Sequence, residues 1–336
     1  MSLSSIINNI PKAELHLHIE GSLTPELMWR LAKKHSVTLP YASVKEIEAA
    51  YNFEDLQSFL DLYYAGAGVL RDEEDFFTLM WEYLSRCHKE NIVHTEIMFD
   101  PQTHTERDIG FDVFMPGFLR AMDKAKQEYG ISSYLIMSFL RHLPESAAFE
   151  TLSEAEPYYK HITAVGLDSS ELGHPPSKFE RVFKKAKSLG FKIVAHAGEE
   201  GPASYIWEAI ELLDVDRIDH GVRCQEDKAL MALLRERQIP LTVCPLSNLK
   251  LCVIDDMKQH NIVELLNEGL LVTVNSDDPT YFGGFLNDNF VALQESLNID
   301  EDTIRTLAAN SFKSSFLPED VKRSFVEKVF NDRENL

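Results

Sequence analysis

Short apolar segments alternate with helical patterns along almost the whole chain, and this alternation limits the fold more than any other feature. Each segment has the length of a β-strand, and the stretch after it carries apolar residues at three- and four-residue spacing, as a helix does. The expected strands are residues 13–21, 92–100, 133–141, 162–169, 191–196, 217–221, 240–248 and 270–279. About eight strand-then-helix units indicate a closed parallel barrel with its helices outside.

The predicted fold class is therefore α/β, a (β/α)8 TIM-type barrel with a helical insertion after the first strand. Residues 41–90 are expected to form the insertion, because their mostly helical pattern is too long for one crossover helix. The alternation continues through the 336 residues without a linker, which predicts a single domain covering residues 1–336.

The composition excludes several classes of partner. A formal net charge of −21 argues against nucleic acid, since clustered Lys and Arg would be needed to hold a phosphate backbone. The four cysteines form no C-x-x-C pair and no dense framework, which predicts reduced thiols and a cytoplasmic location. There is neither a signal peptide nor a run near the roughly 20 apolar residues of a membrane span, so no membrane contact is expected. Nothing in the sequence indicates the oligomeric state.

Polar residues suited to catalysis or metal binding stand where the expected strands end. Two imidazoles lie on one side of the first strand, and others end the fifth and sixth strands. In a parallel barrel the C-terminal ends of the strands meet on one rim, where the chemistry of such enzymes is found. We therefore expect one site built from residues far apart in the sequence: His16, His18, His196, Glu199, His220, Asp277 and Asp278.

Four of these residues form a plausible metal-binding set. His16, His18, His196 and Asp277 predict one divalent ion per chain, with zinc as the expected metal and one position left for water. Bound water would then lose a proton near neutral pH and become a nucleophile. Asp278 is adjacent to Asp277 and should face the opposite way, which leaves it free for substrate. An ordinary turn is the alternative interpretation of these two acids.

Two other rim residues have the chemistry of proton transfer. Glu199 follows a proposed ligand by three residues and would act as a proton carrier if burial raised its pKa. His220 would orient the activated water and stabilise the charge that develops on it. A structural pairing of His220 with Asp219 is the alternative.

Several spaced motifs together resemble the adenosine/adenine deaminase family, and they occur in the family's order from about Pro11 to beyond Phe290. They are HLHIEGS (16–22), SSELGHPPSKF (169–179), HAGEEG (196–201), DHGVR (219–223), CPLSN (244–248) and NSDDPTYFGG (275–284). FDPQTH (99–104) and FLRHL (139–143) are most similar to the branch that acts on free adenine.

This resemblance implies a zinc-dependent hydrolase that converts adenine, a small purine, to hypoxanthine and ammonia, as in purine salvage. The family's zinc ligands correspond to His16, His18, His196 and Asp277, and its proton donor to the purine ring corresponds to Glu199. His220 matches the histidine that assists the metal-activated water. Asp278 matches the acid that hydrogen-bonds the imidazole edge of the ring.

The preference for base over nucleoside needs a further hypothesis. A free base carries a ring N–H where a nucleoside carries ribose, so a carboxylate placed there would accept a hydrogen bond and obstruct the sugar. We expect Glu171, in the loop after the fourth strand, to be that carboxylate, and Glu20 is a second candidate for a contact with substrate or with the residues behind it. A solvent-facing loop acid is the alternative for Glu171.

Other functions remain open at this point. An adenosine deaminase and a deaminase of N6-substituted adenines are the nearest alternatives. A barrel hydrolase with two metals is disfavoured, since no lysine stands at a strand end to bridge them. A purine-binding regulatory protein with an inactive site would be expected to lack Glu199 or a metal ligand.

Overall fold

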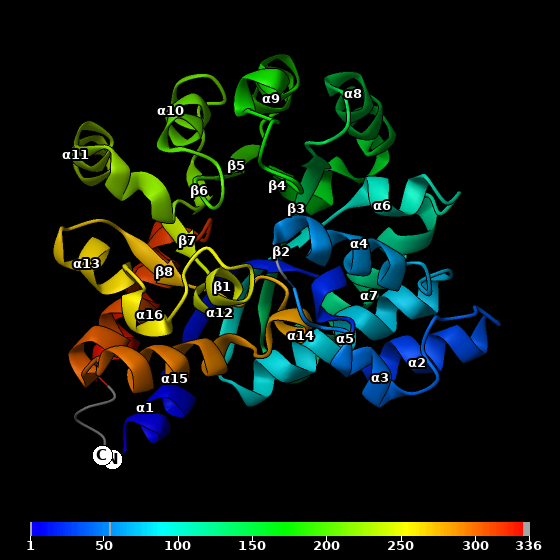
Figure 1. Cartoon of the computed structure of the whole chain (residues 1–336), viewed down its shortest axis with the longest axis horizontal. Coiled ribbons are helices and arrows are strands. Elements are labelled where there is room, and N and C mark those ends of the chain that lie inside the picture. The colour runs from blue at the N-terminus through cyan, green and yellow to red at the C-terminus, as the bar shows by residue number, and fades with distance from the viewer. Residues whose placement is uncertain (1, 54, 332–336) are drawn as a thin grey trace.

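Eight parallel strands form the centre of the molecule, and helices surround them (Figure 1). The computed structural model describes residues 2–53 and 55–331. The strands are β1 (Lys12–His18), β2 (Ile92–Phe99), β3 (Ser132–Leu140), β4 (Ile162–Asp168), β5 (Lys192–Ala197), β6 (Arg217–His220), β7 (Leu241–Val243) and β8 (Val272–Val274). They lie side by side in sequence order, and each neighbouring pair is parallel.

The ring of strands closes between β1 and the segment that follows β8. Leu17 pairs with Asp277 in a parallel bridge, and the His18 N–H donates to the Asp277 carbonyl at 3.0 Å. The Asp277 N–H donates in return to the His16 carbonyl at 3.1 Å. This closed order of eight strands confirms the predicted (β/α)8 barrel.

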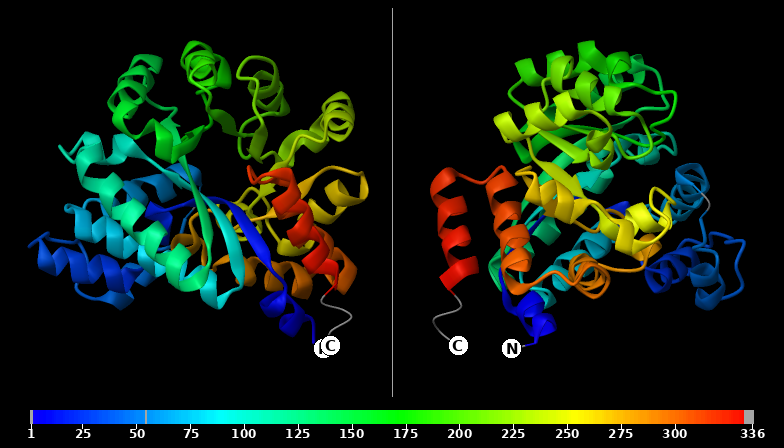
Figure 2. Two further views of the ribbon diagram at one scale, coloured as in Figure 1. Left: turned by 180° about the vertical axis from the view of Figure 1, so that it is seen from behind. Right: turned by 60° about the vertical axis from the view of Figure 1, so that its left-hand side comes forward.

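The helices cover the outside of the barrel, as two further views show (Figure 2). They are α1 (Leu3–Asn9), α2 (Pro25–Lys34), α3 (Val44–Ala49), α4 (Leu56–Ala67), α5 (Glu73–Lys89), α6 (Pro101–Thr105), α7 (Phe111–Tyr129), α8 (Glu145–Glu154), α9 (Glu180–Ser188), α10 (Ala203–Glu211), α11 (Lys228–Arg237), α12 (Pro245–Lys250), α13 (Ile262–Asn267), α14 (Pro279–Phe282), α15 (Leu286–Leu297), α16 (Glu301–Ser314) and α17 (Glu319–Asn331). Within the described residues, no helix combines the length and the apolar character that crossing a bilayer requires.

The extra helices between β1 and β2 have different positions relative to the barrel. Helix α5 packs along α7 and contacts β2, as an ordinary crossover helix of a barrel would. Helices α2 and α3 lie together at one side of the molecule (Figure 1). Helix α4 contributes Phe59 and Tyr63 to an aromatic cluster that also contains Tyr281 and Phe282 from α14. The first crossover thus supplies a cover for the end of the barrel that carries the polar residues.

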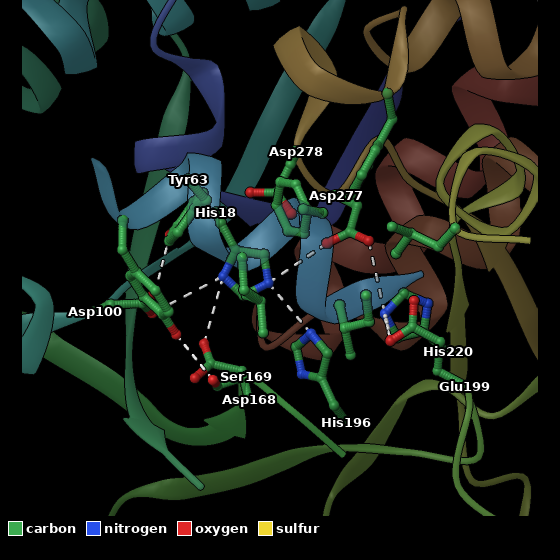
Figure 3. A pocket seen from close by; sticks show the side chains of 16 residues that line it. His18, Tyr63, Asp100, Asp168, Ser169, His196, Glu199, His220, Asp277 and Asp278 are labelled. Atoms are coloured by element: carbon green, nitrogen blue, oxygen red, sulfur yellow. Dashed lines mark hydrogen bonds and ion pairs between the residues drawn. The ribbon is translucent and has the colours of Figure 1, made fainter. Parts of the chain in front are cut away.

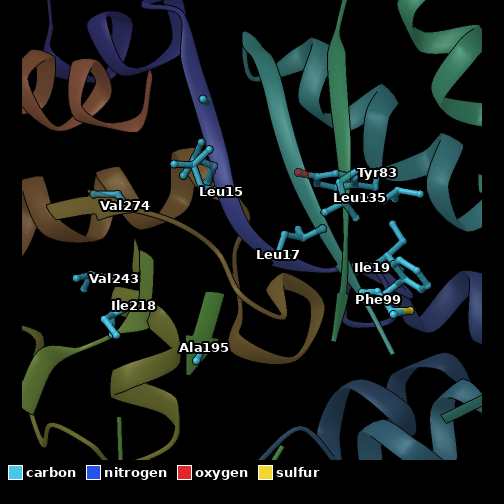
Figure 4. Packing of buried hydrophobic residues seen from close by; sticks show 14 of the residues in the cluster. Leu15, Leu17, Ile19, Tyr83, Phe99, Leu135, Ala195, Ile218, Val243 and Val274 are labelled. Carbon is cyan, nitrogen blue, oxygen red and sulfur yellow. The ribbon is translucent and has the colours of Figure 1, made fainter. Parts of the chain in front are cut away.

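Successive residues of β1 face opposite sides of the barrel wall. Leu15 and Leu17 pack in the apolar layer between strands and helices (Figure 4). The residues that alternate with them, His16 and His18, consequently face the interior. The alternation along the strand therefore delivers both imidazoles to the same space.

Two strands are shorter than expected from the sequence. The segment expected as a strand at residues 240–248 ends as a strand at Val243, because Pro245 is the first residue of α12. Proline lacks the N–H that a sheet requires but fits the first turn of a helix. The segment 270–279 is a strand only over Val272–Val274, and its polar end bends toward β1.

Candidate active site

The structure brings His16, His18, His196 and Asp277 together at the rim of the barrel. Figure 3 shows three of them, His18, His196 and Asp277. Each offers one ligand atom, and the four atoms lie within 4.8 Å of one another. The His16 Nε2 is 3.2 Å from Asp277 Oδ1, and the Nε2 atoms of His18 and His196 are also 3.2 Å apart. All four side chains are buried, so bulk water does not surround this cluster.

The outer ring nitrogens of the three histidines face oxygen atoms. The His16 Nδ1 is 3.0 Å from Thr242 Oγ1 and the His18 Nδ1 is 3.4 Å from Asp168 Oδ2. The His196 Nδ1 lies 3.6 Å from Asp219 Oδ2. Protons on these Nδ1 atoms leave unprotonated Nε2 atoms that face one another. That arrangement suits a cation between them, and the donor set fits a metal such as zinc.

The backbone is strained where two of the rim residues stand. Asp277 has φ of 63° and His220 has φ of 62°, in the left-handed region that most residues avoid. Such strain persists where the surrounding structure enforces it, and it is found often at functional sites. At Asp277 the turn also separates two adjacent acids, since Asp277 enters the metal-binding cluster and Asp278 lines the cavity beside it.

Glu199 lies in the loop after β5 with its carboxyl group in the cavity. The side chain is 3% exposed, and its Oε1 has no hydrogen-bond partner among the described residues. Burial, reinforced by the charges of Asp277 and Glu171, raises the pKa of Glu199 well above its ordinary value. The shift favours the protonated form, from which the carboxyl group can donate a proton.

His220, at the end of β6, lies between Glu199 and Asp277. Its Nε2 is 3.6 Å from Glu199 Oε2 and 3.7 Å from Asp277 Oδ2. Burial lowers the pKa of His220 to about 3, so the imidazole is neutral and able to accept a proton. The alternative pairing of His220 with Asp219 is absent from the ion pairs of the described residues. Asp219 instead lies near His196 and accepts a hydrogen bond from Thr242.

Asp278 lines the same cavity and is closely packed against the end of the first strand. A Cβ atom at Gly21 would lie only 2.0 Å from Asp278 Oδ1, so glycine is required there. Burial and the charge of Asp277 raise the pKa of Asp278 well above its ordinary value. The neutral carboxyl group can donate a hydrogen bond to an acceptor in the cavity.

These residues share a cavity whose empty space, including the part open to solvent, is about 380 Å³. Helix α4 covers it with Leu56, Phe59, Leu60, Tyr63 and Tyr64, and Leu251 and Phe282 add further apolar surface. A flat ring system with a few polar atoms suits such a space, because apolar walls bury the ring and the acids meet its polar edge.

Glu171 and Glu20 have positions that the sequence did not reveal. The carboxylate of Glu171 accepts the backbone N–H groups of residues 198, 199, 200 and 201 at distances of 2.7–3.1 Å, and it does not line the cavity. The structure therefore places it behind the Glu199 loop instead of at the expected contact with substrate. Glu20 also lies behind the cavity, where it contacts His104 at 2.8 Å and accepts from the Asp100 N–H at 3.3 Å.

Sequence reasoning missed several residues of this site. The cavity is also lined by Asp100, Asp168, Tyr63 and Ser169. Asp219 lies next to the histidine cluster, with its Oδ2 near the His196 Nδ1. One signal was available, since Asp100 immediately follows β2 and Asp168 ends β4. In a parallel barrel, an acid at the C-terminal end of a strand is a candidate site residue for the same reason as a histidine there.

Comparisons with known proteins agree with this geometry. The adenosine deaminase family model matches residues 11–332. The adenine deaminase of Acinetobacter baylyi is 59% identical over 329 residues, which cover 98% of this chain and 99% of that protein. The crystal structure of an adenine deaminase from Arthrobacter aurescens has a TM-score of 0.95 at 46% identity, covering 97% of this chain and 99% of that one.

A more distant structure shares the fold. An amidohydrolase from Burkholderia ambifaria, solved with bound Zn, has a TM-score of 0.89 at 23% identity, covering 99% of this chain and 93% of that one. The family match and the full-length relatives confirm the resemblance carried by the motifs. The chain is a hydrolytic deaminase and belongs to the adenosine deaminase family.

Proposed function

We propose that the chain hydrolyses adenine to hypoxanthine and ammonia, with one zinc ion held by His16, His18, His196 and Asp277. The observation that carries this proposal is the convergence of three histidine Nε2 atoms and a carboxylate beside the protonated Glu199. Relatives that cover nearly the whole chain are named adenine deaminase, which supports adenine as substrate. The reaction would place the protein in purine salvage.

The choice of zinc follows from the donor atoms. Three imidazole nitrogens and one carboxylate oxygen suit a borderline-soft divalent ion that leaves a position open. When bound, such an ion lowers the pKa of water and acts as a Lewis acid. Thr242, Asp168 and Asp219 place oxygen atoms 3.0, 3.4 and 3.6 Å from the three Nδ1 atoms, which favours a proton on each Nδ1 and leaves Nε2 for the metal.

Glu199 supplies the proton that the purine ring needs. Attack of water at C6 breaks the aromaticity of the ring, and the electron pair moves onto N1. A carboxylic acid beside N1 donates its proton there, so no full negative charge builds up on the ring. The amino nitrogen then takes up the proton that His220 accepted from water, and its bond to C6 breaks. Ammonia leaves as the C6 hydroxyl returns a proton to Glu199 and becomes the carbonyl of hypoxanthine.

His220 and Asp278 complete the site. The neutral His220 is positioned to accept a proton from the attacking water and to hold that water toward C6. The protonated Asp278 donates to an acceptor nitrogen on the imidazole edge of the base. Together with Glu199 these groups hold the ring in one orientation in a cavity that apolar side chains of α4 cover.

A substrate panel with metal analysis tests the proposal. Ammonia release would be measured for adenine, adenosine and N6-methyladenine, with the metal content of each preparation determined. We expect adenine to be the best substrate, about one zinc per chain, and loss of turnover after chelation that added zinc restores. Faster turnover of adenosine would overturn the assigned substrate, and undiminished activity in fully chelated protein would overturn the assigned metal.

A further inference from the structure

The wall of the cavity opposite Glu199 carries two buried acids that contact no substrate atom in the proposed reaction. Asp100 follows β2 and Asp168 ends β4, and their side chains are 3% and 2% exposed. Figure 3 shows both on one side of His18, with Glu199 and His220 on the other side of the metal-binding cluster. A ligand whose reacting carbon faces that cluster would lie between the two walls.

These acids have oxygen atoms that the described part of the protein leaves unpaired. Asp100 Oδ2 accepts the Tyr63 hydroxyl at 2.8 Å. Asp100 Oδ1 and both oxygens of Asp168 have no donor among the described residues apart from the two carboxyl groups themselves, which can share one hydrogen bond when one of them is protonated. Buried polar atoms are usually hydrogen-bonded, because an atom that loses its hydrogen bonds to water and gains no new partner raises the free energy of the folded state. The free Asp100 oxygen is therefore available to a donor on a ligand.

The two acids have different surroundings, which separates their roles. Asp168 Oδ2 is 3.4 Å from the His18 Nδ1, so Asp168 is the closer of the two acids to this histidine of the metal-binding cluster. Asp100 Oδ1 is 3.9 Å from that nitrogen, too far for a hydrogen bond. Asp100 is the better candidate for direct contact with a ligand.

The surroundings of Asp100 also fix its position and leave little room beyond it. Its backbone N–H donates to Glu20, and Tyr63 bonds both Asp100 and Glu20. Glu20 in turn contacts His104, and all four side chains are buried. A large substituent on a ligand at this end would displace a connected, buried network.

The orientation set by the proposed function determines which ligand atom meets this wall. With C6 at the metal-binding cluster and N1 at Glu199, the imidazole ring of the purine lies on the side away from Glu199. In the N9–H tautomer of adenine, N7 carries no proton and can accept a hydrogen bond, so the proton of the imidazole ring is on N9. A nucleoside has carbon in place of that proton. A buried carboxylate beside N9 would lose its donor and meet the sugar.

We propose that Asp100 accepts the N9–H of the free base and thereby makes the enzyme select adenine over adenosine. This inference rests on the proposed function, because it uses the orientation of adenine assigned there. It places the discriminating carboxylate at the end of β2 and not at Glu171, whose oxygens are both occupied by backbone N–H groups.

The test uses 9-methyladenine, which lacks the N9 proton and adds only one carbon. The kcat/KM of the wild type for 9-methyladenine should be lower than that for adenine by at least about 100-fold. In Asp100→Asn, kcat/KM for adenine should fall at least about tenfold, mainly through KM, while that for 9-methyladenine falls less or rises. The ratio between the two substrates therefore shrinks. Equal losses for both substrates, with zinc content unchanged, would show that Asp100 only supports the structure.

Controls separate this proposal from neighbouring ones. Asp168→Asn should lower zinc affinity and reduce turnover of both substrates alike, because that acid lies 3.4 Å from the His18 Nδ1. If Asp100→Asn does not fold, the wild-type ratio of kcat/KM for adenine to kcat/KM for 9-methyladenine still tests the inference. Comparable values for the two bases would overturn it. A wild type that deaminates neither base defeats the proposed function itself. One that deaminates adenine without rejecting 9-methyladenine defeats the role of Asp100 alone.

Discussion

Two buried carboxylates near the ends of strands show how similar burial can serve opposite purposes. Glu171 is 1% exposed and Asp100 is 3% exposed. The oxygens of Glu171 accept four backbone N–H groups, whereas one oxygen of Asp100 has no partner among the described residues. The first acid has no capacity left for a ligand and holds a loop, while the second can still accept a donor.

Hydrogen-bond saturation, more than burial, therefore separates the acids that form the scaffold from those that perform chemistry. Glu199 belongs with Asp100, since its Oε1 is buried and unpaired. Substitution of an unsaturated acid should change function with little change in stability. Substitution of a saturated acid should change stability as well.

The largest effect is expected for Glu199→Gln. The amide has nearly the same shape but cannot donate the acidic proton, so kcat should fall by about 10³-fold. Zinc content and the thermal midpoint of unfolding should stay close to those of the wild type, because the group has no partner at Oε1 to lose. Turnover within tenfold of the wild type would remove Glu199 from the mechanism and would break the distinction between the two kinds of acid.

Asp219→Asn tests an acid beneath the metal-binding cluster. Its Oδ2 lies 3.6 Å from the His196 Nδ1, and its Oδ1 accepts from Thr242, which contacts His16. Loss of this support should weaken zinc binding by roughly 10- to 100-fold, measured by competition with a chelator. Asp214→Asn, an exposed change near the start of the same strand, serves as the control. Equal zinc affinity in both variants would contradict the support assigned to Asp219.

The distinction between the acids also explains what could be read from the sequence. The residues His16, His18, His196, His220 and Asp277 stood out because strand ends in a parallel barrel meet at one rim. Their convergence follows from topology alone, so an approximate strand assignment was sufficient. Even the strand expected at residues 240–248, which ends at Val243, did not disturb that inference.

The roles of individual loop acids could not be read in the same way. A pattern shows that Glu171 follows the fourth strand, but not that its side chain turns toward the backbone of residues 198–201. Asp100 precedes a proline and looks like an ordinary helix-capping acid in the sequence. Which oxygen is paired depends on contacts between segments about 30 to 80 residues apart, such as those of Asp100 with Tyr63 and Glu20.

Glu171→Gln is expected to affect both loop geometry and pH dependence. The amide NH₂ would face backbone N–H donors, so stability should fall by about 2 kcal/mol and kcat by about 30-fold through displacement of Glu199. Its charge also helps to raise the pKa of Glu199, which must be protonated to act. Removing that charge lowers this pKa, so the loss of activity at high pH should begin at lower pH.

A pH profile of kcat and a denaturant melt would measure these effects. Glu208→Gln is a matched control, because Glu208 also accepts a loop N–H, that of Ser177 at 2.9 Å, but stands away from the cavity. We expect that control to keep the wild-type kcat and pH profile. Suppose that Glu171→Gln unfolds at the same denaturant concentration as the wild type and loses activity at the same high pH. Full hydrogen bonding of an acid would then not identify it as a structural residue.

The smallest effects are expected from two glycine substitutions. One tests the contact of a glycine with Glu171, and the other tests the cost of a left-handed backbone conformation. A Cβ at Gly201 would lie 2.5 Å from Glu171 Oε1, whereas at Gly173 it would meet no atom within 4 Å. Gly173, however, has φ of +80°, which costs other residues about 1 kcal/mol. Gly173→Ala should therefore lower stability by that amount and leave kcat unchanged, while Gly201→Ala should lower kcat roughly fivefold by shifting the Glu199 loop. If both variants lose only stability, the contact between Glu171 and this loop does not position the proton donor.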